Sequence, residues 1–589
     1  MTAFVRDLPF GATLLGEDRT RFRLWAPARQ NVSVAIDRGE TWPMQRRSGG
    51  WFEAEVACGA GARYRYQLGS DLAVPDPASR AQAEDVRGPS TVVDPRAYRW
   101  RHPEWRGRPW HETVLYELHA GLLGGFAGVR AELAKLKRLG ITAVELMPIN
   151  DFPGKRNWGY DGVLPFAPDH AYGSPDDLKA LVDAAHENGL MIFLDVVYNH
   201  FGPDGNYLAS YAPQVFRTDV KTPWGPAIDF RNGEVRGFFT ENALYWLMEY
   251  RFDGLRFDAV HAITEADWLD EMAAQVRETV EPGRYVHLVL EHDGNVAERL
   301  RRDFDAQWND DAHHVLHVML TGEHESYYGD YAERPAGRLA RALAEGFVYQ
   351  GEPSRHRKGE RRGTPSGDLP PTSFVLFIQN HDQIGNRAFG ERLTALADPR
   401  ALEAAIALQL LCPQIPLIFM GEEDASTTPF RFFTDHHGEL AGAVREGRRR
   451  EFAGFAAFAD PQRRASIPDP NAATTFEQSR PVPDPALGSS RRDLYRRLLD
   501  ARRDRIVPRL GGARALDAKV ISEAAVLARW RMGDGAILTI AANLGPAACA
   551  LTTPPGELLF ATGQTGGASV QDGQLEDHTT VAFLEMGRG

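Results

Sequence analysis

The stretch Gly254-Leu-Arg-Phe-Asp-Ala-Val-His261 decides the fold of this chain. Its apolar residues predict a buried strand, and its polar residues gather toward the carboxyl end. Because strand side chains alternate between two faces, Arg256 and Asp258 share one face. A guanidinium beside a carboxylate favours the ionised carboxylate, which is the form that a carboxylate nucleophile needs. A structural ion pair would give the same pattern, so this strand alone leaves both interpretations open.

The sequence on either side repeats a rhythm of strand and helix. We expect strands at 114–119, 141–148, 190–197, 254–260, 286–291, 305–308, 373–379 and 416–420, with helices between most of them. Eight such units predict an α/β fold, a (β/α)8 barrel over residues 113–510. An open doubly wound sheet is the alternative, but no Gly-rich nucleotide loop follows the first strand.

Two insertions interrupt this rhythm. Residues 201–235 form a loop rich in Gly, Pro and aromatic residues after the third strand, and a second insertion lies around 320–370. The second contains a basic run, 355–362, which we interpret as a solvated or mobile loop without a binding role.

The flanks of the barrel differ from it in composition. Residues 1–95 alternate apolar and polar residues between Gly-rich turns, which predicts a β-sandwich that resembles a carbohydrate-binding module and packs on the next domain. Residues 96–112 are expected to be a connector whose tryptophans pack between domains. Short strands return over 511–589 and predict a C-terminal β domain.

Composition excludes several classes of function. The 589 residues carry a net charge of −13, with 80 acidic against 67 basic side chains, which argues against a nucleic-acid partner. The three cysteines are isolated and form no metal-binding pattern, which favours a reducing compartment. No apolar run reaches the length of a membrane span, and the first residues carry no export signal. We therefore expect a cytoplasmic protein without a membrane partner, either a monomer or a small homo-oligomer.

Charged residues collect where the predicted strands end. In strand order they are Asp195 and His200, then Arg256, Asp258 and His261, then Glu291, then His381 and Asp382, and finally Glu422 and Glu423. The carboxyl ends of barrel strands meet on one rim, so these groups are predicted to share a site. Acids on one rim repel each other, which makes a functional site the better interpretation.

Two carboxylates in different charge states suit the cleavage of glycosidic bonds. One must attack as an anion, and the other must hold a proton for the leaving oxygen. Asp258 beside Arg256 fits the nucleophile. Glu291 follows an apolar run and has acidic neighbours, both of which raise the pKa of a carboxyl, so it fits the general acid. Asp382 could bind sugar hydroxyls, and His200 and His381 could donate hydrogen bonds to the same sugar. The sequence contains no nucleophilic serine elbow, phosphate loop or HExxH motif.

Four of these segments resemble the motif regions of the α-amylase family of glycoside hydrolases, in the order of that family. They are Asp195-Val-Val-Tyr-Asn-His200, the stretch 254–261, Glu291, and Gln379-Asn-His-Asp382. The resemblance implies a retaining mechanism on α-glucans, with Asp258 as nucleophile, Glu291 as acid/base and Asp382 as transition-state stabiliser. It places His200, Arg256 and His381 at substrate-binding positions and Tyr160 as the ring that stacks on the cleaved sugar. We add Trp158 and His261 to the predicted substrate-binding set.

A narrower resemblance is carried by 75–80, 152–162, 199–207 and 432–437. These segments are similar to a branch of the family that cleaves the α-1,4 bond joining a maltooligosaccharide to a terminal trehalose, so the implied substrate is maltooligosyl trehalose or a related α-1,4-glucan. Asp424 departs from that branch, because a tryptophan is expected at its position. The resemblance also implies no required metal. Asn199 matches a calcium-site position of amylases, but 201–235 lacks the acids of a site with 6–8 oxygen ligands. We predict no cofactor.

Two other functions remain open at this stage. A glucan branching or debranching enzyme would share the layout of sandwich and barrel. A non-catalytic glucan-binding protein could retain the fold, although such a protein would be expected to have lost one of the three acids, and Asp258, Glu291 and Asp382 are all present.

Overall fold

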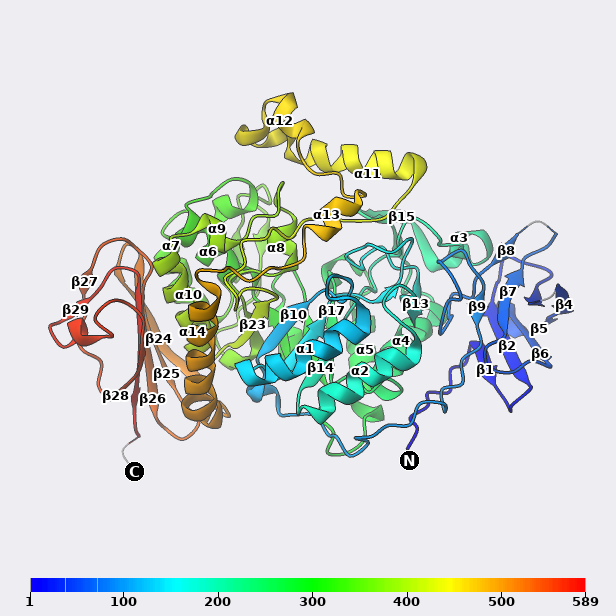
Figure 1. Ribbon diagram of the computed structural model, residues 1–589, viewed down its shortest axis with the longest axis horizontal. Coiled ribbons are helices and arrows are strands. Elements are labelled where there is room, and N and C mark those ends of the chain that lie inside the picture. The colour runs from blue at the N-terminus through cyan, green and yellow to red at the C-terminus, as the bar shows by residue number, and fades with distance from the viewer. Residues whose placement is uncertain (1, 38, 71, 588–589) are drawn as a thin grey trace.

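A closed barrel of parallel strands forms the centre of the computed structural model, which describes residues 2–37, 39–70 and 72–587 (Figure 1). In barrel order the strands are β10 (Leu115–Leu118), β11 (Ala143–Leu146), β14 (Met191–Val196), β17 (Gly254–Phe257), β18 (His287–Leu290), β19 (Ala306–Trp308), β22 (Phe374–Leu376) and β23 (Ile415–Phe419). Strand β23 pairs back with β10, which closes the ring. The predicted (β/α)8 barrel is therefore confirmed.

The opening stretch enters this barrel through a position that requires glycine. Gly254 pairs with Phe193 on the neighbouring strand. A Cβ added at residue 254 would lie 2.1 Å from Cε1 of the Phe193 ring. The phenylalanine can fill the barrel interior only because residue 254 has no side chain, and this close packing fixes the register that carries Arg256 and Asp258 to the rim.

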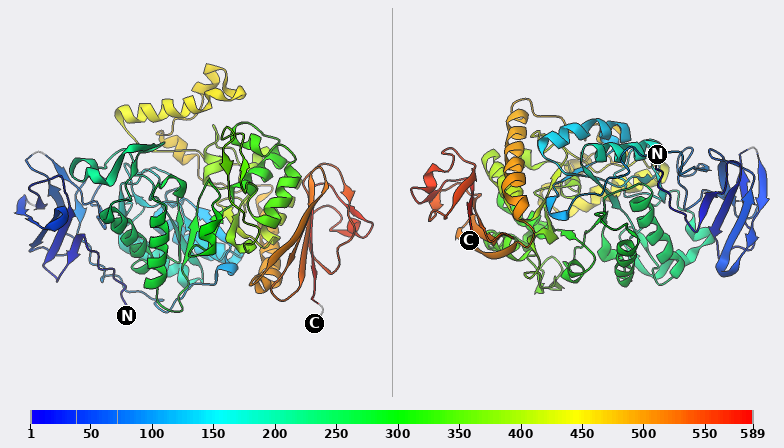
Figure 2. Two further views of the ribbon diagram at one scale, coloured as in Figure 1. Left: turned by 180° about the vertical axis from the view of Figure 1, so that it is seen from behind. Right: turned by 90° about the horizontal axis from the view of Figure 1, so that it is seen from below.

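Helices surround the barrel on its outer side (Figure 2). They include α1 (Gly125–Leu139), α2 (Pro175–Glu187), α4 (Gly233–Met248), α5 (Asp267–Thr279), α6 (Asp310–Thr321), α7 (Pro335–Glu345), α10 (Pro399–Leu411) and α14 (Gly488–Ala501). Helix α2 begins at a capping box formed by Ser174 and Asp177. Between β18 and β19 the chain forms only a short 3-10 helix over Ala297–Arg301, and the sequence did not predict α6 and α7.

The N-terminal region folds as two facing sheets. One contains β1 (Gly11–Leu14), β2 (Thr20–Trp25), β6 (Trp51–Val56) and β5 (Gln45–Arg46), and the other contains β4 (Glu40–Pro43), β3 (Ser33–Ile36), β7 (Arg63–Gln67) and β8 (Ala73–Val74), with β9 (Ser90–Thr91) paired to β7. Arg80 forms a buried ion pair with Glu249 at the end of α4, at 2.8 Å. Phe10 also packs edge-on against Phe166 of the barrel domain. This sandwich is attached to the side of the barrel.

The segment after the sandwich closes the amino-terminal end of the barrel. Trp105 Nε1 donates a hydrogen bond to Asp253, and Trp110 Nε1 donates to the carbonyl of Thr372. Both rings pack on the cluster of side chains that fills the barrel interior. These two indoles therefore have a packing role. They cover the amino-terminal end of the barrel, so the carboxyl-terminal rim is left open for a site.

A second β domain lies at the other end of the molecule, shown in red in Figure 1. Its main sheet has the order β24 (Arg514–Ser522), β25 (Ala525–Arg531), β26 (Ile537–Asn543), β30 (Thr579–Glu585) and β28 (Glu557–Ala561), and a small sheet pairs β27 (Cys549–Ala550) with β29 (Gln574–Leu575). Thr580 Oγ1 donates to the carbonyl of Ala404 on α10. Between barrel and sheet, α11 (Gly438–Glu451) and α12 (Pro461–Ala465) stand above the rest of the molecule, and α13 (Ala473–Glu477) leads back to it (Figure 1).

Each predicted insertion contains a short hairpin. Strands β15 (Phe216–Thr222) and β16 (Gly225–Ile228) lie in the first, and β20 (Glu352–Pro353) and β21 (Arg361–Arg362) lie in the second. Further short elements near the rim are β12 (Asn150–Asp151), β13 (Leu164–Pro168), α3 (Leu208–Tyr211), α8 (His381–Gly385) and α9 (Leu393–Leu396). Across the described ranges, no helix combines the length and the apolar character needed to cross a membrane.

Candidate active site

Arg256 lies at the centre of the carboxyl rim and contacts acids from three neighbouring strands. Its Nη1 lies 2.6 Å from Asp195 Oδ2 and 3.1 Å from Asp258 Oδ1, and its Nη2 lies 2.8 Å from Glu291 Oε2. The guanidinium is 4.1 Å from the ring centroid of Trp308, and Arg256 is only 1% exposed. One cation thus brings together three carboxylates that are far apart in the sequence.

Asp258 is held as an acceptor on both of its oxygens. Oδ1 faces Arg256, and Oδ2 accepts a hydrogen bond of 2.7 Å from Asn199 Nδ2. The same amide nitrogen donates to the backbone carbonyl of Asp258. A carboxylate that receives only donors is oriented as an anion, which is the form that attacks a sugar carbon.

Glu291 is prepared differently. Its Oε2 accepts a hydrogen bond of 2.8 Å from the backbone N–H of Ala259, a residue with a φ of +40° in the left-handed region. Burial raises the pKa of Glu291 well above its usual value, and the negative charges of Asp258, Asp310 and Asp382 raise it further against the opposing effect of Arg256. A carboxyl that keeps its proton is suited to act as a general acid.

Asp382 and His381 follow the seventh strand at the start of α8. Asp382 Oδ1 accepts a 2.6 Å hydrogen bond from Asn386 Nδ2, and burial raises the pKa of Asp382 although His381 and Arg256 oppose the change. The His381 ring stacks on the ring of Tyr160, with centroids 5.2 Å apart. The hydroxyl of Tyr160 in turn donates to Asp195, so these groups connect to the carboxylates around Arg256.

His200 contacts the backbone of Tyr160, whereas His381 contacts its ring. The Nε2 of His200 is 2.9 Å from the backbone carbonyl of Tyr160, and burial lowers the pKa of His200. The indole of Trp224 stacks on His200 at 5.0 Å with an interplanar angle of 14°, and Trp224 is 45% exposed. Trp224 lies in the hairpin β15–β16 and was not predicted as a site residue. Its position as an aromatic residue in a Gly/Pro-rich insertion beside the rim could have indicated it.

Two predicted substrate-binding residues do not join this group in the expected way. Trp158 is 4% exposed, because Phe430 stacks on its ring at 5.4 Å and Phe432 and His381 pack against it edge-on. The buried ring offers too little surface to stack on a sugar, so the predicted direct contact is corrected to a packing role beneath His381. His261 is exposed on the rim, where its Nδ1 lies 3.5 Å from the backbone nitrogen of Asp293.

The acids after β23 turn away from Arg256. Glu422 accepts hydrogen bonds from the backbone N–H of Phe419 and from the hydroxyl of Tyr495, and burial raises its pKa to about 8. Asp424, which replaces the expected tryptophan, forms an ion pair with Arg492 of α14, with Nε at 2.8 Å. The charge at position 424 therefore has a partner outside the group around Arg256.

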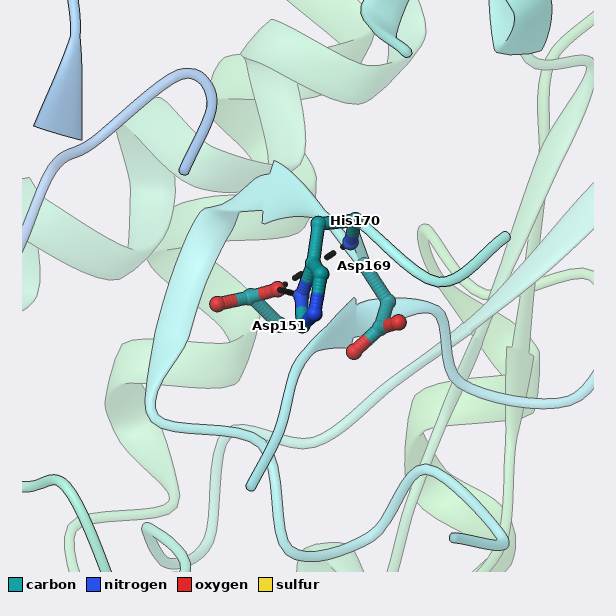
Figure 3. A group of neighbouring side chains, drawn as sticks. All are labelled: Asp151, Asp169 and His170. Carbon is teal, nitrogen blue, oxygen red and sulfur yellow. Dashed lines mark hydrogen bonds and ion pairs between the residues drawn. The ribbon is translucent and has the colours of Figure 1, made fainter. Parts of the chain in front are cut away.

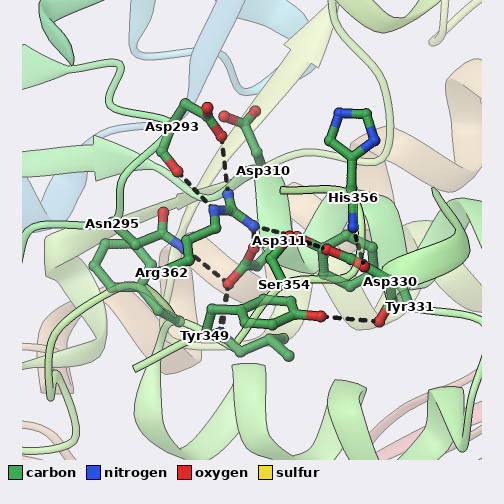
Figure 4. A network of polar contacts seen from close by, with 12 residues as sticks. Asp293, Asn295, Asp310, Asp311, Asp330, Tyr331, Tyr349, Ser354, His356 and Arg362 are labelled. Atoms are coloured by element: carbon green, nitrogen blue, oxygen red, sulfur yellow. Dashed lines mark hydrogen bonds and ion pairs between the residues drawn. The ribbon is translucent and has the colours of Figure 1, made fainter. Parts of the chain in front are cut away.

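The basic run 355–362 was interpreted as a solvated or mobile loop without a binding role, and most of it is exposed, but its last residue, Arg362, is buried. Arg362 is 6% exposed, and its Nη1 lies 2.7 Å from Asp311 Oδ1 (Figure 4). Its Nε donates to the backbone carbonyl of Asp293, and Arg357 pairs with the Asp293 side chain. The sequence could not show these acids as partners because they lie more than 45 residues away.

One group of side chains has a spacing that a metal ion could use. Single ligand atoms of Asp151, Asp169 and His170 lie within 4.8 Å of one another (Figure 3). His170 Nδ1 is 2.9 Å from Asp151 Oδ1, and the two oxygens of Asp169 accept N–H groups of Phe152 and Ala171. These hydrogen bonds account for the arrangement, and we assign no ion to it. Asn199 likewise uses its amide on Asp258 and His200.

Comparison with known proteins identifies the three regions of the chain. A family model for the α-amylase catalytic domain matches residues 94–219, one for carbohydrate-binding module 48 (isoamylase N-terminal domain) matches 9–73, and one for a domain of unknown function (DUF3459) matches 513–582. A malto-oligosyltrehalose trehalohydrolase of Deinococcus radiodurans is 43% identical over 481 residues, 80% of this chain and 78% of that protein. One of Rhizobium sp. strain M-11 is 38% identical over 92% of this chain and 94% of its own. A crystal structure titled as a putative α-amylase from Salmonella typhimurium superimposes with a TM-score of 0.92 at 43% identity, covering 99% of this chain and 100% of that one.

A closed parallel barrel with Asp258, Glu291 and Asp382 on its carboxyl rim, beside a module-48 sandwich, defines a glycoside hydrolase of the α-amylase class, which acts on α-glucans. The long alignments narrow that class. The chain belongs to the malto-oligosyltrehalose trehalohydrolase family.

Proposed function

We propose that this enzyme hydrolyses the α-1,4-glucosidic bond between a maltooligosaccharide and its terminal trehalose, and releases trehalose with retention of configuration. The observation that carries the mechanism is the shared guanidinium: Nη1 of Arg256 contacts Asp258 and Nη2 contacts Glu291. Two acids on one guanidinium lie within the span of a single sugar, which favours the short separation of about 5–5.5 Å found in retaining enzymes. The substrate is supported by the names of the relatives that align over most of this chain.

The proposed roles follow from the charge state that each contact favours. Asp258 attacks the anomeric carbon as an anion held by Arg256 and Asn199. Glu291 protonates the leaving oxygen and then takes a proton from the water that cleaves the glycosyl-enzyme. Asp382 stabilises the positive charge that develops on the sugar ring. We further propose Tyr160 as the stacking ring and His200 and His381 as donors to that sugar.

The leaving group is proposed to extend toward His261. One open depression is lined by His261, His292, Asp293 and Arg357. It is close to Glu291, because His292 directly follows Glu291 in the sequence and the backbone N–H of Val260, next to His261, donates to the Glu291 carbonyl. Its imidazole and guanidinium groups can bind the hydroxyls of a disaccharide. Trp224 is proposed as a second platform, on the side of His200.

The decisive assay is incubation with maltotriosyl trehalose, with the products separated by chromatography. We expect trehalose and maltotriose in equal amounts, and maltotriose that is first released as the α-anomer in NMR spectra. Absence of trehalose, with the protein shown to be folded by circular dichroism, would reject the proposal. Release of β-maltotriose would keep the substrate and reject the retaining mechanism.

A glucan branching or debranching enzyme is the alternative, since it would use the same three acids. It predicts a change in the iodine staining of amylose, or the release of linear chains from amylopectin. The two functions are separated by running these assays in parallel with the trehalose assay. Asp258→Asn serves as the inactive control. We expect the ratio of rates to favour maltotriosyl trehalose.

A further inference from the structure

A buried carboxylate outside the proposed catalytic set lies directly behind His381. Glu117 is on β10, 264 residues away in the sequence, and is almost fully buried. Its Oε1 contacts Nδ1 of His381, and its Oε2 accepts a hydrogen bond of 3.1 Å from the His381 backbone N–H. Both oxygens of Glu117 thus serve one residue, which is the arrangement of a side chain that orients a histidine.

The hydrogen bonds around His381 determine its charge. The hydroxyl of Tyr160 donates to Asp195 Oδ2 at 2.6 Å, and that oxygen also accepts from Arg256. Since a hydroxyl has only one proton to donate, its oxygen must accept from His381 Nε2, 2.8 Å away. Nδ1 faces the Glu117 carboxylate, so it carries a proton as well. A histidine that donates from both ring nitrogens is an imidazolium.

The electrostatics around His381 agree with that count of protons. Burial alone would lower the pKa of His381, but the carboxylate of Glu117 outweighs burial and the pKa is raised. The charged or titratable groups that act on it are Glu117 on β10, Asp382 on α8, Arg256 on β17 and His119 after β10. Asp195 joins them through Tyr160.

The neighbouring strand supplies a second glutamate in a contrasting state. Glu145 on β11 is the register partner of Glu117 on β10, and it is equally buried. Within the described part of the chain, neither of its carboxyl oxygens has a hydrogen-bond partner. Burial raises the pKa of Glu145 well above its usual value, and the charges of Glu117 and Asp195 raise it further. A buried carboxyl without a hydrogen-bond partner favours its neutral form, whereas both oxygens of Glu117 contact nitrogen atoms of His381.

We propose that Glu117 is a positioning residue, which holds His381 as a cation and through it fixes Tyr160 and Asp382 against the reacting sugar, whereas Glu145 contributes no charge to the site. The inference rests on the proposed function for its catalytic consequence. The cation favours the anionic form of Asp382, whose pKa it lowers, and an anionic Asp382 is what stabilises positive charge on the sugar. It also donates the hydrogen bond that holds the Tyr160 ring.

The test compares the same substitution at two register partners, Glu117→Gln and Glu145→Gln. Each removes a carboxyl and keeps its shape. We expect Glu117→Gln to lower kcat by about 10- to 100-fold with a smaller effect on KM, as for other residues that orient a catalytic group. Glu145→Gln, which replaces one neutral group by another, should stay within about twofold of the wild type. In a His381→Gln background the Glu117→Gln substitution should have little further effect.

A spectroscopic measurement tests the charge independently of any substrate. Histidine-selective 13C labelling, with the His381 signal assigned by its loss in His381→Gln, follows the protonation of that ring against pH. We expect His381 to remain an imidazolium to higher pH in the wild type and in Glu145→Gln than in Glu117→Gln. Equal titration in all three, or a loss of activity in Glu145→Gln that matches that of Glu117→Gln, would overturn the proposal.

The two readouts also separate this inference from the proposed function. If no protein in the series releases trehalose, the proposed function fails, and the titration of His381 still tests the role of Glu117. If Glu117→Gln does not fold, Glu117→Asp is measured instead. It should keep His381 charged while its shorter side chain lowers kcat, and an uncharged His381 in that variant would overturn the proposal.

Discussion

Two buried arginines each bind several acids in this protein, and their surroundings differ. Arg256 contacts Asp195, Asp258 and Glu291 on the barrel rim. Arg362, in the insertion after α7, contacts the carboxylates of Asp311 and Asp293, the hydroxyl of Tyr331 and the backbone carbonyl of Asp293 (Figure 4). Both guanidiniums are almost completely buried, so burial alone does not distinguish a site from a structural network.

The number of donors for each acid is what distinguishes them. Asp311 Oδ2 accepts from Asn295 Nδ2 and from the backbone N–H groups of Val348 and Tyr349, in addition to the contacts of its other oxygen. Around Arg256, one cation serves three acids. There, burial raises the pKa of Asp195 to about 6, whereas Arg362 and Arg357 overcome burial to lower the pKa of Asp293. An acid such as Asp311, which accepts hydrogen bonds from several donors of its own, stabilises the fold. Acids that share one guanidinium, as around Arg256, have fewer donors each and keep a charge state that can react.

Asp258→Asn is the most severe test of this comparison. Removing the proposed nucleophile should reduce trehalose release by about 10³-fold or more, because no glycosyl-enzyme can form. The same change removes one of the crowded negative charges, so Tm should stay level or rise. A rate assay at high enzyme concentration and a melting curve provide the two measurements. Turnover above about 10% of the wild type would remove Asp258 from its role.

Asp311→Asn is the matched change in the other network, and it should have the opposite profile. An amide there faces the Val348 and Tyr349 N–H groups and leaves Arg362 with only the more distant carboxylate of Asp293, 3.5 Å from its Nη2. We expect this to cost about 3–5 kcal/mol of unfolding free energy. Denaturant titration measures that loss. The folded fraction should retain the kcat of the wild type. A variant of normal stability with lost activity would instead place Arg362 in the site.

Glu291→Gln should cost about 10²–10⁴-fold on maltotriosyl trehalose, since a sugar leaving group needs a proton. A substrate whose leaving group departs without one separates this role from folding. With α-maltosyl fluoride, we expect Glu291→Gln to recover most of the loss in the first step, whereas Asp258→Asn should recover nothing. Equal losses on both substrates would exclude Glu291 as the general acid.

The sequence predicted the barrel because its strands are fully buried and their apolar runs differ from the flanking helices. It missed α6 because histidines take some of the buried positions of that helix: His313 and His317 are buried beside Leu316, which weakens the apolar pattern. A polar residue that is buried with its hydrogen bonds satisfied has no signature in a single sequence. The burial of Arg362 could not be predicted for the same reason, because its partners are distant in the sequence.

For the candidate site, the sequence correctly predicted that Arg256, Asp258 and Glu291 meet, but it wrongly added Glu422 and Glu423 and did not show which faces the side chains present. The strand ends placed Arg256, Asp258 and Glu291 together because barrel topology fixes where strands end. Trp158 was given a surface role because its motif lies beside Tyr160, and only packing shows that Phe430 covers it. Glu117 was read as part of a strand, since its partner His381 is distant in the chain.

Asp310→Asn should change the pH dependence of activity while preserving most of its maximum. Asp310, the first residue of α6, adds negative charge that helps to keep Glu291 protonated. With that charge gone, the pKa of Glu291 falls, so the loss of kcat/KM at rising pH should begin at lower pH than in the wild type. Asp267→Asn on the exposed side of α5 is the control and should leave the profile unchanged. A profile for Asp310→Asn that matches this control would show that the acids of the rim do not act on Glu291.

The smallest effect is expected at Glu422, a buried acid whose hydrogen-bond donors among the described residues are neutral groups. Burial raises its pKa to about 8 in the folded protein, above that of an unfolded glutamate. The folded state thus binds the proton more tightly, and this contribution to stability is complete below about pH 4.5 and is lost as pH rises through about 8. Glu422→Gln should therefore raise Tm by a few degrees at pH 9 and leave it unchanged at pH 5. The matched change at Glu423, whose pKa burial raises to about 7, should give the same sign. A lower Tm for both variants at pH 9 would mean that neutral hydrogen bonds stabilise a buried acid as well as a guanidinium does, and the contrast between the networks of Arg256 and Arg362 would lose its physical basis.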